Sequence, residues 1–232
     1  MIYHDVAQGT PQWHALRARH YTSSEAAAMM LVSPYETRED LLARKAKGET
    51  QRPGGNQWLY DQGHAAEARA RIVAEEMLGE ELYPATISAE INGLPLLASM
   101  DGLTVDGEVG WEHKLYSKRV AEALASQGEP PIHHVWQLEH QMLVTGCKKI
   151  LYMLSAQGVD PIWRWYESKP ERAQALIDGW RQFHAELHDP ARVLVEHEAT
   201  IRDFLSSRQW RKGEEPRVRA ILAEFLKHMH KG

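Results

Sequence analysis

Residues 99–114 carry the clearest structural signal in the chain and read Ser99-Met-Asp101-Gly-Leu-Thr-Val-Asp-Gly-Glu-Val-Gly-Trp-Glu112-His-Lys114. Short strands are predicted at both ends of this stretch, and Asp106-Gly107 between them is typical of a two-residue hairpin turn. That turn places Asp101 directly opposite Glu112, provided that no bulge at Gly110 shifts the register. Opposed side chains of an antiparallel pair point to one face, with Cβ atoms roughly 5 Å apart.

Lys114 shares this face, because it lies two residues beyond Glu112 on the same strand. Two carboxylates held this close repel each other unless a divalent cation or the lysine compensates their charge. Oxygen ligands suit Mg²⁺ or Mn²⁺ better than Zn²⁺, and such a metal beside a lysine can assist the hydrolysis of a phosphodiester. The alternative is a surface ladder of salt bridges, in which Lys114 merely pairs with Asp101 and Glu112.

Helical and strand patterns alternate on either side of the hairpin. Helices are expected at residues 25–30, 37–48, 56–78, 117–126 and 133–144, and from residue 170 to the end. Strands are expected at residues 82–87, 96–99, 102–105, 109–115, 150–154 and 161–166. This order predicts an α/β fold, with a central mixed sheet of about five strands, flanking helices and one crossover helix pair.

Composition excludes several classes of protein. The chain has 232 residues, with 27 Lys and Arg against 32 Asp and Glu, so it is not a globally basic nucleic-acid coat. A nucleic-acid enzyme remains open, because positive charge can be concentrated in one cleft. A single cysteine, Cys147, excludes intramolecular disulfides and Cys-ligated metal clusters. We expect a cytoplasmic protein without membrane contact, because neither a signal peptide nor a long apolar run is apparent.

Five motifs, taken together, resemble those of a known family. They are Trp13-His-Ala-Leu-Arg17 followed by Thr22-Ser-Ser24, then Gly63-His-Ala-Ala-Glu67, Ala98-Ser-Met-Asp101-Gly, Glu112-His-Lys114 and Trp136-Gln137 through Thr145. In this order they resemble the phage lambda-type exonucleases, which are the YqaJ-like viral recombinase or alkaline exonuclease family, over about residues 8–155. Met100 stands where that family has proline, and His113 where it usually has an apolar residue.

The resemblance implies a restriction-endonuclease-like core of the PD-(D/E)xK type. It implies one exonuclease domain over residues 1–232, with a core at about 8–167 and a helical C-terminal extension at about 170–232. The implied activity is Mg²⁺-dependent digestion of one strand of linear double-stranded DNA, from a 5′-phosphorylated end, to mononucleotides. Two Mg²⁺ ions, replaceable by Mn²⁺, a ring-like homotrimer and a single-strand annealing protein as partner are implied as well. The setting would be phage-type recombination in the cytoplasm of a bacterial host.

The same resemblance assigns roles in the chemistry. Asp101 and Glu112 would bind metal together with the backbone carbonyl of His113. Lys114 would orient or activate the attacking water. Glu67 would complete the metal site from its helix. Taken by itself, Glu67 is equally an ordinary solvated acid on a helix surface.

Three further residues receive roles in the same way. Gln137 would sit beside the catalytic face, and Arg17 and Ser24 would hold the 5′-terminal phosphate. A bidentate guanidinium and a hydroxyl at a helix start suit a phosphate. Two rival functions stay open: an endonuclease or single-strand nuclease on the same core, and a catalytically idle module that binds DNA ends.

Overall fold

The computed structural model describes residues 1–50 and 57–189 of the chain, so the helices expected beyond residue 190 lie outside the described residues. The chain divides into two compact units, Met1–Arg181 and Gln182–Gly232. The sheet and the candidate site belong to the first unit. Among the described residues, no helix combines the length and the apolar character needed to cross a bilayer.

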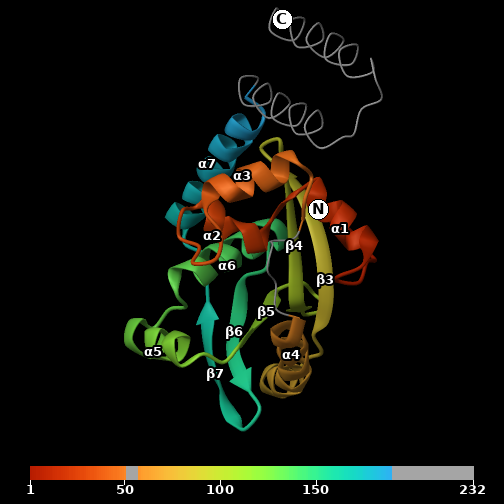
Figure 1. The fold of residues 1–232 in the computed structure, drawn as a ribbon. Coiled ribbons are helices and arrows are strands. Elements are labelled where there is room, and N and C mark those ends of the chain that lie inside the picture. Colours follow the sequence, from red (N-terminus) through yellow and green to blue (C-terminus); the bar gives the residue numbers. More distant parts are fainter. Residues whose placement is uncertain (51–56, 190–232) are drawn as a thin grey trace, which may run out of the picture. The chain divides into compact units, whose positions relative to one another are not determined.

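A seven-stranded mixed sheet forms the centre of the first unit (Figure 1). Its strands are β1 (Ile2–His4), β2 (Tyr21–Thr22), β3 (Tyr83–Ile91), β4 (Leu94–Leu103), β5 (Val109–Leu115), β6 (Lys149–Ala156) and β7 (Val159–Tyr166). The spatial order is β1-β3-β4-β5-β6-β7, with β2 beside β4, and the β2–β4 and β5–β6 pairs are parallel. The predicted mixed α/β core is confirmed. The strand count of about five is wrong, because β1 and β2 are too short to show an alternating pattern.

Strand β4 is longer than the sequence pattern suggested. Two short strands were expected at residues 96–99 and 102–105, whereas one strand runs without a break from Leu94 to Leu103. It begins directly after Asn92-Gly93, and both residues have positive φ, 54° and 78°. Ile91 pairs with Leu94, so this is a two-residue hairpin of the kind that requires positive φ at both central positions.

The β4–β5 hairpin has the predicted register. Gly102 pairs with Trp111 and Leu103 with Gly110, and the pairs continue toward the turn without a bulge. A residue shift would have turned every side chain of β5 to the other face. The register therefore places Asp101 and Glu112 at neighbouring positions on adjacent strands.

The turn of this hairpin differs from the prediction of a two-residue loop at Asp106-Gly107. Thr104 N donates to Val109 O over 3.0 Å, and Gly107 N donates to Thr104 O over 2.9 Å, so residues 105–108 form a four-residue loop. Asp106 favours it, because its Oδ1 accepts from the Thr104 hydroxyl over 2.6 Å. The register survives, because the loop is longer by one residue on each strand.

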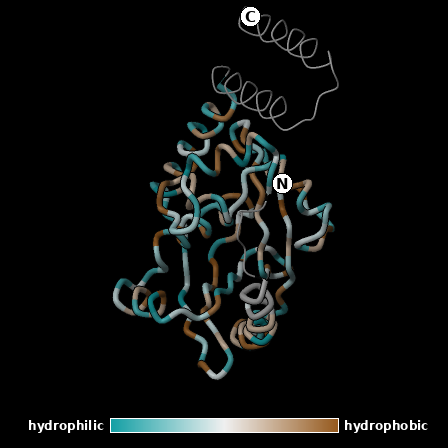
Figure 2. Tube along the Cα trace, in the orientation of Figure 1, coloured by the Kyte–Doolittle hydropathy of each residue, from teal (hydrophilic) through white to brown (hydrophobic). Residues whose placement is uncertain are grey.

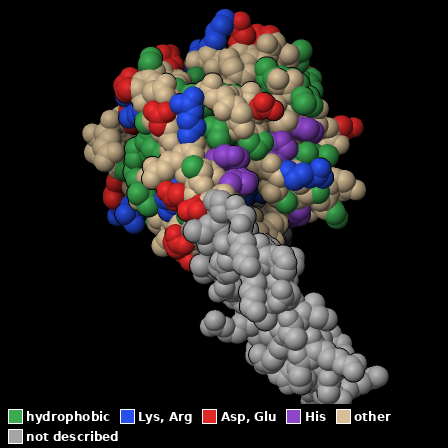
Figure 3. All heavy atoms as spheres, turned by 90° about the horizontal axis from the view of Figure 1, so that it is seen from above, with side chains coloured by type: hydrophobic (Ala, Val, Ile, Leu, Met, Phe, Trp, Pro, Cys, Tyr) green, Lys and Arg blue, Asp and Glu red, His purple; other side chains and the backbone are tan. Residues whose placement is uncertain are grey.

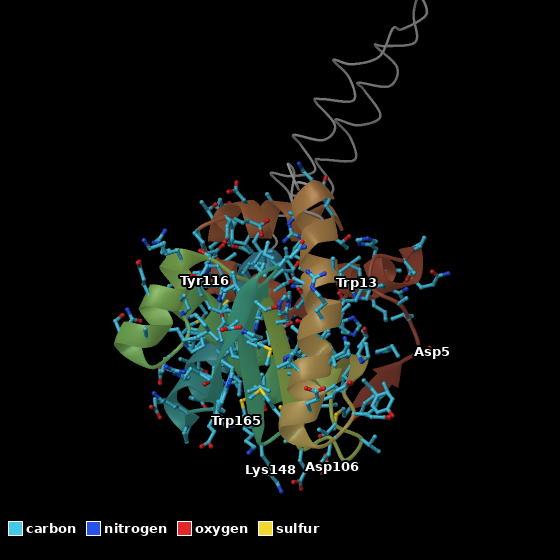
Figure 4. The ribbon with its side chains drawn as sticks, turned by 90° about the horizontal axis from the view of Figure 1, so that it is seen from below. Asp5, Trp13, Asp106, Tyr116, Lys148 and Trp165 are labelled. Atoms are coloured by element: carbon cyan, nitrogen blue, oxygen red, sulfur yellow. The ribbon has the colours of Figure 1, made fainter. Side chains whose placement is uncertain are left out.

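Helices cover both faces of the sheet. They are α1 (Pro11–Ala18), η1 (Ser23–Glu25), α2 (Ala26–Met29), α3 (Arg38–Ala46), α4 (Gln57–Leu78), α5 (Lys118–Gln127), α6 (Ile132–Thr145) and α7 (Pro170–Leu187). Helix α4 lies across the strands (Figure 4), and its Ala70 and Ala74 pack on Trp111, Leu151 and Met153. Helices α5 and α6 form the crossover between β5 and β6, and apolar positions are frequent along β6 (Figure 2).

Candidate active site

Strand β4 pairs with β2 along its first half and with β5 at its end, and the candidate site lies where this partner changes. The first half of β4 pairs with β2 through Leu96 and Leu97, whereas its end pairs with β5 from Gly102 onward. Asp101 immediately precedes the β5 pairing, and its Oδ2 accepts a hydrogen bond of 2.8 Å from His113 N. The carboxylate thus takes the place of the next main-chain partner and joins the two strands where they begin to separate.

Glu112 is a buried carboxylate whose oxygens are both hydrogen-bonded, and its side chain exposes only 2% of its surface. Its Oε1 accepts from Lys114 Nζ over 2.5 Å and from Gln137 Nε2 over 2.6 Å. Its Oε2 accepts from Gln141 Nε2 over 2.6 Å. Lys114 Nζ also donates to Gln137 Oε1 over 3.0 Å, so this amide is oriented at both ends. The structure therefore brings the predicted residues Glu112, Lys114 and Gln137 into one network.

Acidic side chains outnumber basic side chains around this network. Burial raises the pKa of Asp101 well above its usual value, and the carboxylates of Glu112 and Glu67 raise it further. Burial alone would lower the pKa of Lys114, but Glu112 and Asp101 outweigh it and hold the pKa above its usual value. Lys114 is therefore an ammonium that faces the carboxylates of Glu112 and Asp101. A divalent cation would supply the charge that keeps Asp101 ionised.

Glu67 is placed on α4 and is joined to Asp101 through Arg71. Arg71 Nη2 donates to Glu67 Oε1 over 3.2 Å and to Asp101 O over 2.7 Å. Its Nη1 donates to Leu82 O over 2.9 Å, and its guanidinium lies 5.1 Å from the centre of the Trp111 ring. Arg71 carried no role in the sequence interpretation, although its place four residues after Glu67 is the spacing of helical ion pairs.

The oxygen donors fit a hard divalent cation. Within residues 1–50 and 57–189, no three His, Cys, Asp or Glu side chains are arranged as a metal-binding group. The fit rests instead on Asp101, Glu112 and the main chain between the two strands, which offer oxygen atoms and an excess of negative charge. The His113 ring does not take part: it hydrogen-bonds Ser155 over 2.9 Å, and burial, followed by Lys114, lowers its pKa to about 4.

Arg17 and Ser24 also lie together, as the resemblance implied. Arg17 Nη2 donates to Ser24 Oγ over 3.1 Å, and its guanidinium lies 4.5 Å from the centre of the Trp13 ring. Trp13 Nε1 donates to Ser99 Oγ over 3.0 Å, and Figure 4 shows Trp13 on α1. Ser99 precedes Asp101 by two residues on β4, and the register of β4 against β3 shifts between Met100 and Leu103. One strand therefore carries both groups of predicted residues.

The sequence interpretation missed several members of the site. Gln141 follows Gln137 by one helical turn, and that spacing alone places both amides on one face of α6. Ser99 lies two residues before Asp101 on β4 and binds Trp13. On the face of the molecule in Figure 3, Lys and Arg side chains lie among Asp and Glu side chains.

Comparison with known proteins finds a matching family and similar solved structures. The YqaJ-like viral recombinase domain matches residues 12–148. No curated protein matches the chain in sequence. The crystal structure of an alkaline exonuclease, LHK-Exo from Laribacter hongkongensis, is similar with a TM-score of 0.67 and 20% identity over 83% of this chain and 100% of that one. Its complex with dAMP gives 0.68 and 21% over the same shares. At this level of identity, the likeness to the exonuclease is one of fold.

Proposed function

Because the chain belongs to the YqaJ-like viral recombinase family, we propose that it is a metal-dependent exonuclease that degrades one strand of linear double-stranded DNA from its 5′ end. Family and fold support the broader function, a nuclease of phage-type recombination. One observation carries the more specific proposal, which is exonuclease activity from the 5′ end. The carboxylate–lysine network of Glu112 and Lys114 and the Arg17–Ser24 pair are both connected to one strand, β4.

In this proposal Asp101, Glu112 and the backbone carbonyl of His113 hold Mg²⁺, or Mn²⁺ in its place, and Glu67 contributes to a second ion. Bound ions would supply Lewis acidity toward the scissile phosphate and toward the leaving oxygen. The raised pKa of Asp101 supports this assignment, because burial and the carboxylates of Glu112 and Glu67 together outweigh the effect of Lys114, and a bound cation would offset them.

The side chains of the chain itself position the reactants. Lys114, held charged by Glu112, donates a hydrogen bond to the attacking water, while Gln137 fixes the direction of its ammonium. Gln141 and Gln137 keep both oxygens of Glu112 in place. The water attacks phosphorus and releases a proton to solvent, the bond from phosphorus to the 3′ oxygen of the terminal nucleotide breaks, this oxygen takes up a proton, and a mononucleotide leaves.

Each such cut leaves a new 5′-phosphate on the shortened strand. Arg17 and Ser24 are proposed to bind it through a guanidinium fork and a hydroxyl, and Trp13 holds the guanidinium from one side. We also propose one exonuclease domain over residues 1–232, with its core at about 8–167, and a homotrimer in the cytoplasm of a bacterial host that acts with a single-strand annealing protein. These last points rest on the family.

The test is digestion of a linear duplex that carries a 5′-phosphate at one end only, with Mg²⁺ or with EDTA. We expect Mg²⁺-dependent loss of the phosphorylated strand, and a loss of at least about a hundredfold in rate for Lys114→Ala. Lys169→Ala removes a half-exposed lysine outside this network and should leave the rate unchanged. Cutting of circular duplex at the same rate would favour an endonuclease. Binding without degradation would favour the DNA-end-binding module.

A further inference from the structure

Four charged side chains are buried together beside Arg17 and Ser24, and the proposed chemistry does not use them. These are Glu25, Glu36, Arg44 and Lys45, here called the Glu25 cluster, and each exposes 8% or less of its side chain. Burying charges is costly even when they are paired, so a cluster of this kind is a poor source of stability. The hydrogen bonds from this cluster to the segments of Arg17 and Ser24 indicate a role other than stability.

Lys45 fastens the end of α1. Its Nζ donates to Arg17 O over 3.0 Å and to His20 O over 2.6 Å, and it lies 2.8 Å from Glu25 Oε2. These three contacts match the three protons of an ammonium. The main chain of Arg17 is therefore held by a side chain of α3, which lies at the same end of the sheet (Figure 1).

Glu25 fastens the segment that contains Ser24. Its Oε2 accepts from Thr22 N over 3.0 Å, and its Oε1 accepts from Arg44 Nη1 over 3.2 Å. Arg44 in turn binds Glu36 through Nε and Nη2, over 2.7 and 3.1 Å. Ser24 lies between the two residues, Thr22 and Glu25, that this carboxylate joins.

We propose that the Glu25–Lys45 ion pair sets the spacing of Arg17 and Ser24 and so positions the subsite for the 5′-phosphate. The pair joins the main chain at Arg17, through Lys45, to the main chain at Thr22, through Glu25. Glu25 and Lys45 are positioning residues, because their own polar atoms are engaged with the protein. The inference rests on the proposed function, of which it names two further residues.

Charge and position make opposite predictions for Glu25. Glu25→Gln removes a negative charge from beside Arg17, and electrostatic attraction alone would then bind a phosphate more tightly. If the ion pair positions the subsite, the same substitution binds it more weakly. Lys45→Met removes a positive charge, yet a positioning role predicts a change in the same direction as Glu25→Gln.

The experiment compares KM and kcat of the full-length protein on duplexes with 5′-phosphate and with 5′-hydroxyl ends, in Mg²⁺. We expect both Glu25→Gln and Lys45→Met to raise KM for 5′-phosphate ends about tenfold or more, with much smaller changes in kcat and on 5′-hydroxyl ends. Glu76→Gln makes the same charge change at an exposed position of α4 and should change neither substrate.

Four results would decide against the inference or its premise. Tighter binding of 5′-phosphate ends by Glu25→Gln, or undiminished preference for them in both variants, overturns the positioning role. A wild-type protein that does not distinguish the two ends contradicts the proposed function itself. If Glu25→Gln does not fold, as thermal unfolding would show, Glu25→Asp keeps the charge but shortens its reach by one methylene. An unchanged end preference in that variant also overturns the inference.

Discussion

At the scale of single residues, the two glutamines of α6 distinguish this site from a simple pair of acids. Glu112 is almost fully buried, and a buried carboxylate needs hydrogen-bond donors to remain ionised. Gln137 and Gln141 supply them, one to each oxygen. The two uncharged amides therefore fix the orientation of the Glu112 carboxylate.

Gln141 gives the sharpest test of this view. Gln141→Met keeps most of the volume but removes the donor to Glu112 Oε2, so we expect a loss of roughly tenfold to a hundredfold in kcat, equal to about 1–3 kcal/mol. Steady-state kinetics on a 5′-phosphorylated duplex measures it. Gln174→Met is the matched control, because Gln174 bonds only an exposed aspartate one turn away on α7. Equal rates for the two variants would contradict the role of Gln141.

The sequence predicted residues whose contacts are local. It missed residues whose contacts join distant parts of the chain. Asp101, Glu112 and Lys114 lie within one hairpin, where a turn and a two-residue period are enough to relate them. Arg71 acts on Asp101 from 30 positions away, and Lys45 acts on Arg17 from 28. Such contacts depend on how α4 and α3 pack, and no local pattern reports that packing.

At the scale of elements, Gly102 allows close packing at the β4–β5 hairpin. A Cβ at this position would lie 2.9 Å from the Cβ of Leu82 and 3.1 Å from Trp111 Cε3, and neither atom is the end of a flexible chain. The glycine allows Leu82 and Trp111 to close over the strand directly beside Asp101. Hairpin geometry and site geometry are therefore coupled at this residue.

We expect Gly102→Ala to destabilise the protein by about 1–3 kcal/mol through overpacking and to lower activity by displacing Asp101. Gly63→Ala is the matched control: it lies within α4, and among the described residues nothing approaches within 4 Å of the added Cβ. Alanine should stabilise that helix by about 0.5–1 kcal/mol. Urea unfolding checks both signs, and destabilisation of similar size in both variants would contradict this account.

Elements were predictable where periodicity was long and unreliable where it was short. The helix at residues 56–78 and the strand at 109–115 appear within a residue of their expected bounds as α4 and β5. β1 and β2 have three residues or fewer, which is less than the alternation needed for a signal. The Asp106-Gly107 turn was misjudged because the Asp106 side chain competes for the loop's hydrogen bonds.

At the scale of the whole molecule, the acidic site opposes the stability of the fold in the absence of metal. The folded state raises the pKa of Asp101 through burial and through Glu112 and Glu67. A carboxyl group with a raised pKa favours the folded state when it is protonated, and this contribution is lost as pH rises. The contribution of Asp101 to the stability of the metal-free chain therefore falls as pH rises through its raised pKa.

Two thermal measurements follow at neutral pH. Without metal, Asp101→Asn should unfold at a higher temperature than the wild type, because asparagine still accepts from His113 N but carries no charge. At a Mg²⁺ concentration of 100 Kd, the wild type should gain about 2.7 kcal/mol, or roughly 5–10 °C for a domain of this size. The variant should gain much less. An equal gain in both proteins would show that Mg²⁺ binds elsewhere.

The short separation of Ser99 and Asp101 along β4 has a consequence for the size of each catalytic step. Ser99, which bonds the Trp13 beneath Arg17, and Asp101 are separated by two residues of strand, a rise of roughly 6.7 Å. Consecutive phosphates of a nucleic-acid strand are separated by a similar length. Under the proposed function, a 5′-phosphate bound at the Ser99 end would bring the next phosphodiester to Asp101. The short distance along β4 between the two groups would then favour a product of a single nucleotide.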